Sequence, residues 1–298
     1  MTLIDSPPPP TAREQGPLAP PRDDEEAPTL LIKPPSGWAA LDLREVWHFR
    51  DLLFTLAGRD LKLRYKQTAL GAIWVVIQPL MAAGIFTVVF GKIANLSSDG
   101  LPYFIFAYVG QLGWGLFANT VTKSSGCLVG NAHLISKVYF PRFILPLSSL
   151  PSTFVDSGIA AAMLVGLMFY YHTFPGVGIL LLPLWIAILL AMSLGIGLIA
   201  SALTVSYRDV GYILPVFMQL LMYASPVAYG VSNVPASIKP YYYANPLSPV
   251  LEGFRWSLLN TPAPDWQPVA YAAGVALLLL FAGAFSFKRM ERRFADVV

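Results

Sequence analysis

The sequence predicts an all-α integral membrane protein: six transmembrane helices, an N-terminal amphipathic interface helix, and a re-entrant or interfacial outer segment between spans 5 and 6. Composition is the first reason, because 55% of the 298 residues are hydrophobic and 12% are charged. A mean hydropathy of +0.58 does not describe a water-soluble surface. The second reason is length, since a span needs about 20 mainly apolar residues. Such runs occur at 70–91, 103–122, 146–171, 178–204, 211–230 and 268–287.

The first 40 residues differ from the rest of the chain. They contain a proline run at 7–10 and an acidic run at 23–26, and they lack apolar periodicity. A segment of this kind cannot bury enough apolar surface to fold. We therefore expect residues 1–40 to form a disordered tail. They do not have the basic start and apolar core of a secretory signal, so we expect the tail to stay in the cytosol.

Residues 41–66 are predicted to form the amphipathic helix at the membrane surface. Apolar side chains recur between charged ones in its first half, as in interfacial helices. A basic cluster follows directly before span 1, and it consists of Arg59, Lys62, Arg64 and Lys66. Lys and Arg are retained in the cytosol, so this cluster is expected to anchor the start of the first span there.

The distribution of basic residues predicts the orientation. Six spans put both ends of the chain on one side of the membrane. From residue 33 onward, the segments on that side carry fifteen Lys and Arg residues, whereas the opposite side carries only Lys92, Lys239 and Arg255. By the positive-inside rule, both termini are expected in the cytosol. Pro183 near the start of span 4 is expected to mark where the regular helix begins.

The outer segment between spans 5 and 6 has too many prolines to be a seventh span. Its part SPVLEGFRWSLL (248–259) is amphipathic and aromatic. It is expected to lie in or dip into the outer interface, where Tyr and Trp are favoured. Glu252 and Arg255 are three residues apart and so predict either a simple ion pair or a gate at the exit.

The residues give no support for an enzyme that acts alone. The three histidines are far apart in the predicted topology, the carboxylates do not pair at a common depth, and the chain lacks the G-x-x-x-x-G-K-[ST] phosphate loop. Cys127, the single cysteine, fits neither a disulfide nor a zinc site, and we expect it to be a small buried residue. No metal or other cofactor is expected on this chain. The net charge of +3 gives no reason to expect nucleic-acid binding.

A polar, basic loop separates spans 2 and 3. Its first residues predict a short polar helix, and Pro141 is expected to end or kink that helix. A short amphipathic helix at the ends of two spans can insert into a groove on a partner. A surface helix without a partner is the alternative. The candidate contact residues are Asn131, His133, Lys137, Tyr139, Phe140, Pro141 and Arg142.

This loop, NAHLISKVYFPR (131–142), resembles the cytosolic loop of ABC-2-type permeases that export polysaccharides, including O-antigen, capsule and teichoic acid permeases. Four other segments resemble the same family in the same order along the chain. They are RDLKLRYKQTALGAIWVVIQPL (59–80), SYRDVGYILP (206–215), NPLSPVLEGFRW (245–256) and FKRMERRFADVV (287–298). The resemblance covers residues 41–298, which we take as one transmembrane domain, and excludes the tail.

The resemblance implies a half-transporter in the cell inner (plasma) membrane. Two copies of the chain form the channel as a homodimer, and two copies of a separate cytosolic ATPase bind ATP and Mg beneath it. The implied cargo is a lipid-linked polysaccharide, with O-antigen on a polyprenyl diphosphate favoured. By matching motif, 131–142 corresponds to the coupling helix and 41–66 to the interfacial gate helix. Tyr207, Arg208 and Asp209 correspond to a second, minor cytosolic contact.

Three further sets of residues are candidates for handling the cargo. The basic cluster at 59–66 either guides the lipid diphosphate, since Arg makes forked contacts with phosphate oxygens, or serves topology alone. Asp156, the one carboxylate inside a predicted span, either has a function or lies shallow in the membrane. Spans 1 and 5 line the conduit in this family, although aromatic residues there could equally pack or face lipid. The pore candidates are Trp74, Gln78, Phe86, Phe217, Gln219, Met222 and Tyr223.

Three rival functions stay open on the sequence. One is an ABC-2-type exporter of another glycolipid or a drug. Another is a membrane-bound glycosyl- or acyltransferase, which should have clustered carboxylates or a His-Asp pair at a span end. The third is a non-catalytic scaffold, which would tolerate substitutions at 131–142.

Overall fold

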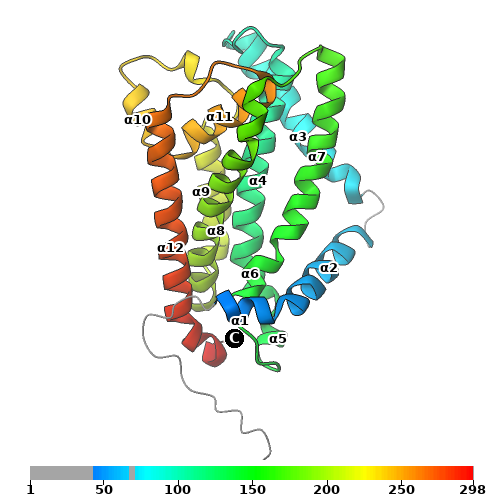
Figure 1. Cartoon of the computed structure of the whole chain (residues 1–298), viewed down its shortest axis with the longest axis vertical. Coiled ribbons are helices and arrows are strands. Elements are labelled where there is room, and N and C mark those ends of the chain that lie inside the picture. Colours follow the sequence, from blue (N-terminus) through cyan, green and yellow to red (C-terminus); the bar gives the residue numbers. More distant parts are fainter. Residues whose placement is uncertain (1–42, 67–70, 298) are drawn as a thin grey trace, which may run out of the picture. The chain divides into compact units, whose positions relative to one another are not determined.

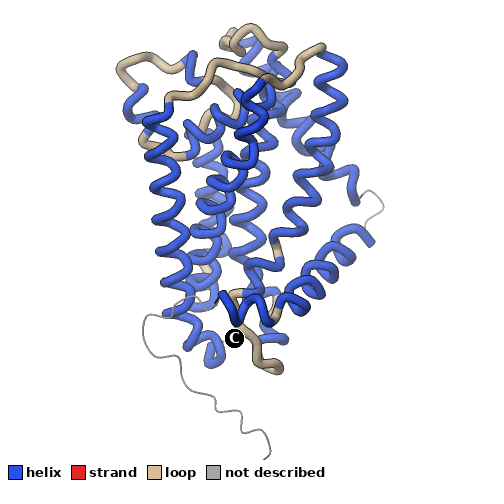
Figure 2. The backbone as a smooth tube through the Cα atoms, in the orientation of Figure 1, coloured by secondary structure: helices blue, strands red, loops and turns tan. Residues whose placement is uncertain are grey.

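A computed structural model of the chain describes residues 43–66 and 71–297. The tail predicted at 1–40 lies outside the described residues. Every regular element in the described part is a helix, as Figure 2 shows, so the predicted all-α class is confirmed. Contacts group Ala40–Val298 into one unit, and all elements below belong to it.

The predicted interface helix is two helices. α1 (Leu43–His48) is followed after one residue by α2 (Arg50–Lys66), which rises toward α7 in Figure 1. Leu56 and Ala57 of α2 are buried, and α2 packs against α6 and α7. One face of α2 is therefore fixed on the bundle.

Within the described residues, four helical stretches are long and apolar enough to cross a membrane. They are Ile73–Ile93, Ile144–Tyr171, Val177–Ser206 and Trp266–Glu291. These stretches coincide with predicted spans 1, 3, 4 and 6, so the chain is a multi-pass membrane protein. Their helices are α3 (Gly71–Phe86) with the π-helix η1 (Thr87–Ile93), α6 (Ile144–Ser148) with α7 (Leu150–Tyr171), the 3-10 helix η2 (Val177–Leu181) with α8 (Leu182–Ser206), and α12 (Trp266–Val297). Pro183 lies in the first turn of α8, as predicted, because a helix start needs no donor there.

The other two predicted spans differ from expectation. α4 (Tyr103–Gly130) continues eight residues beyond the predicted end at 122. α9 (Val210–Ala224) has 15 residues, about 22 Å of helix at 1.5 Å per residue, which is shorter than a hydrocarbon core of about 30 Å. Its predicted end at 230 is wrong. Ser225 is extended because it precedes Pro226 and the proline ring disfavours a helical neighbour.

One helix of the outer segment packs into the bundle. It forms η3 (Val231–Asn233), α10 (Lys239–Tyr243) and α11 (Leu247–Leu259). Most of α11 is buried, and it packs against α4 and α8. Its position relative to the outer interface, in it or dipping into it, stays a prediction. A polar chain ties α11 to α8 and η2: the indole of Trp185 donates to Ser257 Oγ at 2.8 Å, and that hydroxyl donates to the Gly178 carbonyl at 2.7 Å.

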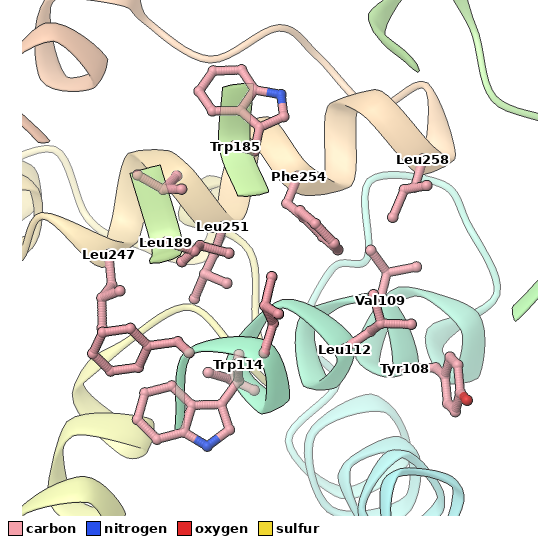
Figure 3. Close-up of a cluster of buried hydrophobic side chains, with 14 of the residues drawn as sticks. Tyr108, Val109, Leu112, Trp114, Trp185, Leu189, Leu247, Leu251, Phe254 and Leu258 are labelled. Atoms are coloured by element: carbon pink, nitrogen blue, oxygen red, sulfur yellow. The ribbon is translucent and has the colours of Figure 1, made fainter. Parts of the chain in front are cut away.

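The core lies where α4, α8 and α11 meet. Figure 3 shows Leu251 and Phe254 of α11 directed toward α4, with Leu112 opposite them. Close approach depends on glycine, since a Cβ on Gly110 would collide with the Val227 carbonyl and one on Gly113 would lie 2.8 Å from Leu251. Cys127 is buried, as predicted.

Candidate functional site

The candidate residues gather at opposite ends of the helices. In Figure 1, α1, α5 and the C-terminal part of α12 lie near one end, whereas α10 and α11 lie near the other. We call them the α5 end and the α11 end. Each end contains a charged side chain that is almost completely buried.

The loop at the α5 end contains a short helix, α5 (Ala132–Ile135). This helix ends at Ile135, six positions before Pro141, so the prediction that Pro141 ends or kinks it is wrong. The chain is held there by Phe140, which is buried in a cluster with Ile144 and other apolar residues. Tyr139 points the other way and is 78% exposed.

Both ends of this loop are fixed to distant parts of the chain. At its start, Arg59 Nη2 of α2 donates to Asn131 Oδ1 at 2.7 Å, and Asn131 Nδ2 donates to the Cys127 carbonyl at 2.8 Å. At its end, the Arg142 amide donates to Glu291 Oε1 at 3.2 Å, and the Arg142 guanidinium donates to the Glu291 carbonyl. Sequence reasoning missed Glu291, although it lies within the C-terminal segment that resembles the family.

Between these two fixed points the loop presents an exposed surface. Together with Tyr139, the side chains of His133, Lys137 and Val138 are exposed. Arg208 and Asp209 are also exposed, at the turn between α8 and α9. The structure therefore leaves Tyr139 accessible to a partner, whereas Phe140 is occupied inside the chain.

Asp156 of α7 is the centre of a buried ion-pair cluster near the α5 end. Its side chain is 3% exposed, and its Oδ2 lies 2.8 Å from Lys123 Nζ and 3.0 Å from Arg64 Nη2. Tyr65 Oη donates to Oδ1 at 2.7 Å. Burial and this hydrogen bond raise the pKa of Tyr65 to about 12, so the phenol remains a donor. Lys123 and Tyr65 were missed because their partner comes from a helix far away in sequence.

The four residues of the predicted basic cluster fall into two groups, two arginines with partners in the chain and two exposed lysines. Arg59 contacts Asp60 at 2.8 Å as well as Asn131, and Arg64 contacts Asp156. Lys62 and Lys66 are exposed on α2. The two arginines attach α2 to the bundle, and the two lysines face outward.

The pore candidates lie on the least covered helices. Trp74, Gln78, Phe217, Gln219 and Tyr223 are exposed, and Met222 is half-buried. Only Met218 of α9 is buried, so this apolar helix lacks a cover within the described chain. Phe86 is the exception among the candidates: it is buried and packs edge-on against Phe90, with ring centroids 5.7 Å apart. Phe86 therefore packs within the described chain, and its place in a pore stays a prediction.

The buried charge at the α11 end is Arg255. Its guanidinium donates to the Val227 carbonyl at 2.7 Å and the Tyr229 carbonyl at 3.2 Å, and it lies 4.1 Å from the centroid of the Phe106 ring. The structure does not pair it directly with Glu252, which accepts from Tyr243 Oη at 3.2 Å. The predicted i,i+3 ion pair is thus wrong, because Arg255 turns into the bundle to bind carbonyls that Pro226 and the loop leave without partners.

Glu252 and Arg255 line one pocket of about 220 Å³ with Asp99, Asp265 and other residues of the outer loops. Burial raises the pKa of Glu252 to about 7, which the hydrogen bond from Tyr243 and the charge of Arg255 partly oppose. A carboxyl with this pKa titrates near neutral pH.

Comparison with known proteins gives matches over most of the chain. The family described as ABC-2 type transporter matches residues 51–259. The O-antigen export system permease protein RfbA of Myxococcus xanthus is 26% identical over 258 residues, which cover 86% of this chain and 98% of that protein. The protein of the same name from Klebsiella pneumoniae is 27% identical over 83% of this chain and 95% of its own length. The polysialic acid transport protein KpsM of Escherichia coli is 23% identical over 78% of this chain and 91% of its own length.

Proposed function

This chain belongs to the ABC-2 type transporter family, and we propose that it is the permease subunit of an ATP-driven exporter of lipid-linked polysaccharide. The proposed cargo is a glycan on a polyprenyl diphosphate, with O-antigen favoured, and the proposed location is the cell inner membrane. Two relatives named for O-antigen export match 86% and 83% of the chain. Their names support this cargo over a drug or another small lipid.

The proposed permease crosses the membrane six times, with both termini in the cytosol. Besides the four apolar stretches, the two remaining proposed crossings are α4 and α9. The short α9 would cross where the bilayer thins around it. We propose that two copies form a homodimer, and the sparse burial of α9 supports this arrangement. A second copy that covers α3 and α9 would place Trp74, Gln78, Phe217, Gln219, Met222 and Tyr223 along a shared conduit.

The chain itself is proposed to be non-catalytic, with two copies of a cytosolic ABC ATPase that bind ATP and Mg²⁺ and drive export. The observation that carries this proposal is the loop at 131–142, where exposed Tyr139 lies between two fixed points. A loop held at Asn131 by α2 and at Arg142 by α12 transmits a displacement, whereas a free loop would absorb it. We propose that His133, Lys137 and Tyr139 contact the ATPase directly, with Arg208 and Asp209 as a minor second contact. Phe140, Pro141 and Arg142 hold the loop in shape.

Deletion of the gene tests the proposed function. Cells that lack the permease should lose their surface polysaccharide and accumulate lipid-linked glycan inside, and a plasmid copy should restore display. In parallel, the purified permease should bind an ABC ATPase from the same organism and couple its ATP hydrolysis to lipid-linked glycan. Normal display in the deletion strain, or a permease that binds no ATPase, would contradict the proposal.

A further inference from the structure

We propose that Asp156 competes with the diphosphate of the cargo for Arg64. It holds Arg64 in the unloaded permease and releases it when a lipid diphosphate arrives at α2. This inference rests on the proposed function, and it adds a specific carboxylate and a specific exchange of partners to it.

The groups around Asp156 form the kind of donor set that binds phosphate. They are a guanidinium, an ammonium and a phenol, all within 3.0 Å of one carboxylate. Arg and Lys are the usual phosphate-binding side chains. Two cations face the Asp156 carboxylate, so one of them can move to another anion while the other keeps Asp156 paired.

Lys123 and Arg64 differ in how readily they can leave Asp156 for another anion. The Lys123 side chain is 19% exposed and that of Arg64 is 40% exposed. Lys123 also donates to Ser152 Oγ at 2.9 Å, one turn before Asp156 on α7. A buried carboxylate that lost every cation would be strongly destabilised. Lys123 therefore stays as the permanent counter-ion, and Arg64 is the cation that can leave.

A lipid diphosphate is a stronger partner for Arg64 than the carboxylate. It carries more negative charge and offers several oxygens to the forked guanidinium. Exposed Lys62 and Lys66 lie on the same helix and add attraction near the membrane surface. When Arg64 moves to the diphosphate, α2 loses its ion pair with α7 and retains the Tyr65 hydrogen bond. Arrival of cargo is thus linked to a weaker attachment of α2.

Binding of undecaprenyl diphosphate to the full-length permease with its ATPase in lipid nanodiscs tests this exchange. Asp156→Asn removes the competitor for Arg64. If Arg64 is available about a tenth of the time in the native protein, this variant binds about tenfold more tightly. Arg64→Ala should bind about tenfold more weakly. The double variant should match Arg64→Ala, because the gain from Asp156→Asn acts through Arg64.

Lys62→Ala is the matched control, since Lys62 is a basic residue on the same helix without a contact to Asp156. It should weaken binding by the same factor with Asp156 or Asn at position 156. A second route guards against misfolding of Asp156→Asn, in which Lys123 is left buried and uncompensated. Lys123→Met combined with Asp156→Leu removes both charges, a replacement that buried pairs tolerate, and it should give the same tighter binding.

Each outcome has one meaning. If the native protein binds the lipid diphosphate and neither charge-removing variant binds it more tightly, the competition is overturned and the proposed function is left intact. A gain that persists with Arg64→Ala also overturns it. Failure of the native protein to bind the lipid diphosphate overturns the proposed function itself. If the charge-removing variants also bind inorganic diphosphate more tightly, the competition is supported and the diphosphate anion alone is recognised. If only the lipid diphosphate binds more tightly, the competition is supported and the headgroup is recognised in the membrane.

Discussion

Tyr139→Ala should separate docking from folding at the α5 loop. Its side chain is 78% exposed, and an exposed substitution of this kind changes the free energy of unfolding by about 0.5 kcal/mol or less. As a central docking tyrosine it would contribute about 2–4 kcal/mol to binding. At 1.4 kcal/mol per tenfold, the Kd for the ATPase should rise by roughly 30- to 700-fold.

The assay compares ATPase affinity and thermal stability of the purified permease side by side. Tyr170→Ala is a matched control, since Tyr170 is 75% exposed at the far end of α7 and should change neither quantity. Phe140→Ala is the opposite control: its side chain is buried, so it should lower stability by about 3–5 kcal/mol. If Tyr139→Ala binds the ATPase within twofold of the native protein, the docking role of the loop is refuted.

Three further predictions concern stability. Gly110→Ala should destabilise the permease by about 1–3 kcal/mol, because the added Cβ meets the Val227 carbonyl. Gly115→Ala is the control and should be neutral or slightly stabilising, because the nearest atom to its added Cβ lies 3.9 Å away. Equal melting temperatures for the two variants would contradict this prediction. Arg255→Met should cost about 3–5 kcal/mol by leaving two buried carbonyls unpaired, and an unchanged urea midpoint would refute it. The pKa of Glu252, raised to about 7, exceeds its unfolded value of about 4.3, so the folded state binds the proton more tightly and stability falls as pH rises between these values. Glu252→Gln should flatten that dependence, by at most about 3 kcal/mol, in melts at pH 5 and 8.

Apolar length predicted the membrane helices well, because a span must satisfy its own backbone within about 20 residues. The same argument made α9 too long. The end of α9 depends on Pro226, a local effect that hydropathy averages out. The sequence also did not predict that α11 packs against α4 and α8, because only tertiary packing decides which neighbours an amphipathic, aromatic helix contacts.

The candidate site divides in the same way. The sequence identified 131–142 and the basic cluster, because local patterns of charge and proline mark both. It did not identify the partners of Asp156, since Arg64 and Lys123 lie 92 and 33 positions away in a sequence without pairing signals. It also predicted an ion pair for Arg255 from spacing alone. That inference failed because the guanidinium donates to two backbone carbonyls inside the bundle instead.

The two fixed ends of the α5 loop have a consequence for changing partner specificity. If residues 131–142 were replaced by the loop of a relative, the relative's residues at positions 131 and 142 would face the native Arg59 and Glu291. Unless those residues suit the new loop, the graft loses its supports and adopts another shape. The functional unit of exchange is therefore discontinuous, consisting of the loop, one residue of α2 and the C-terminal turn region of α12, and a successful hybrid exporter would have to inherit all three together.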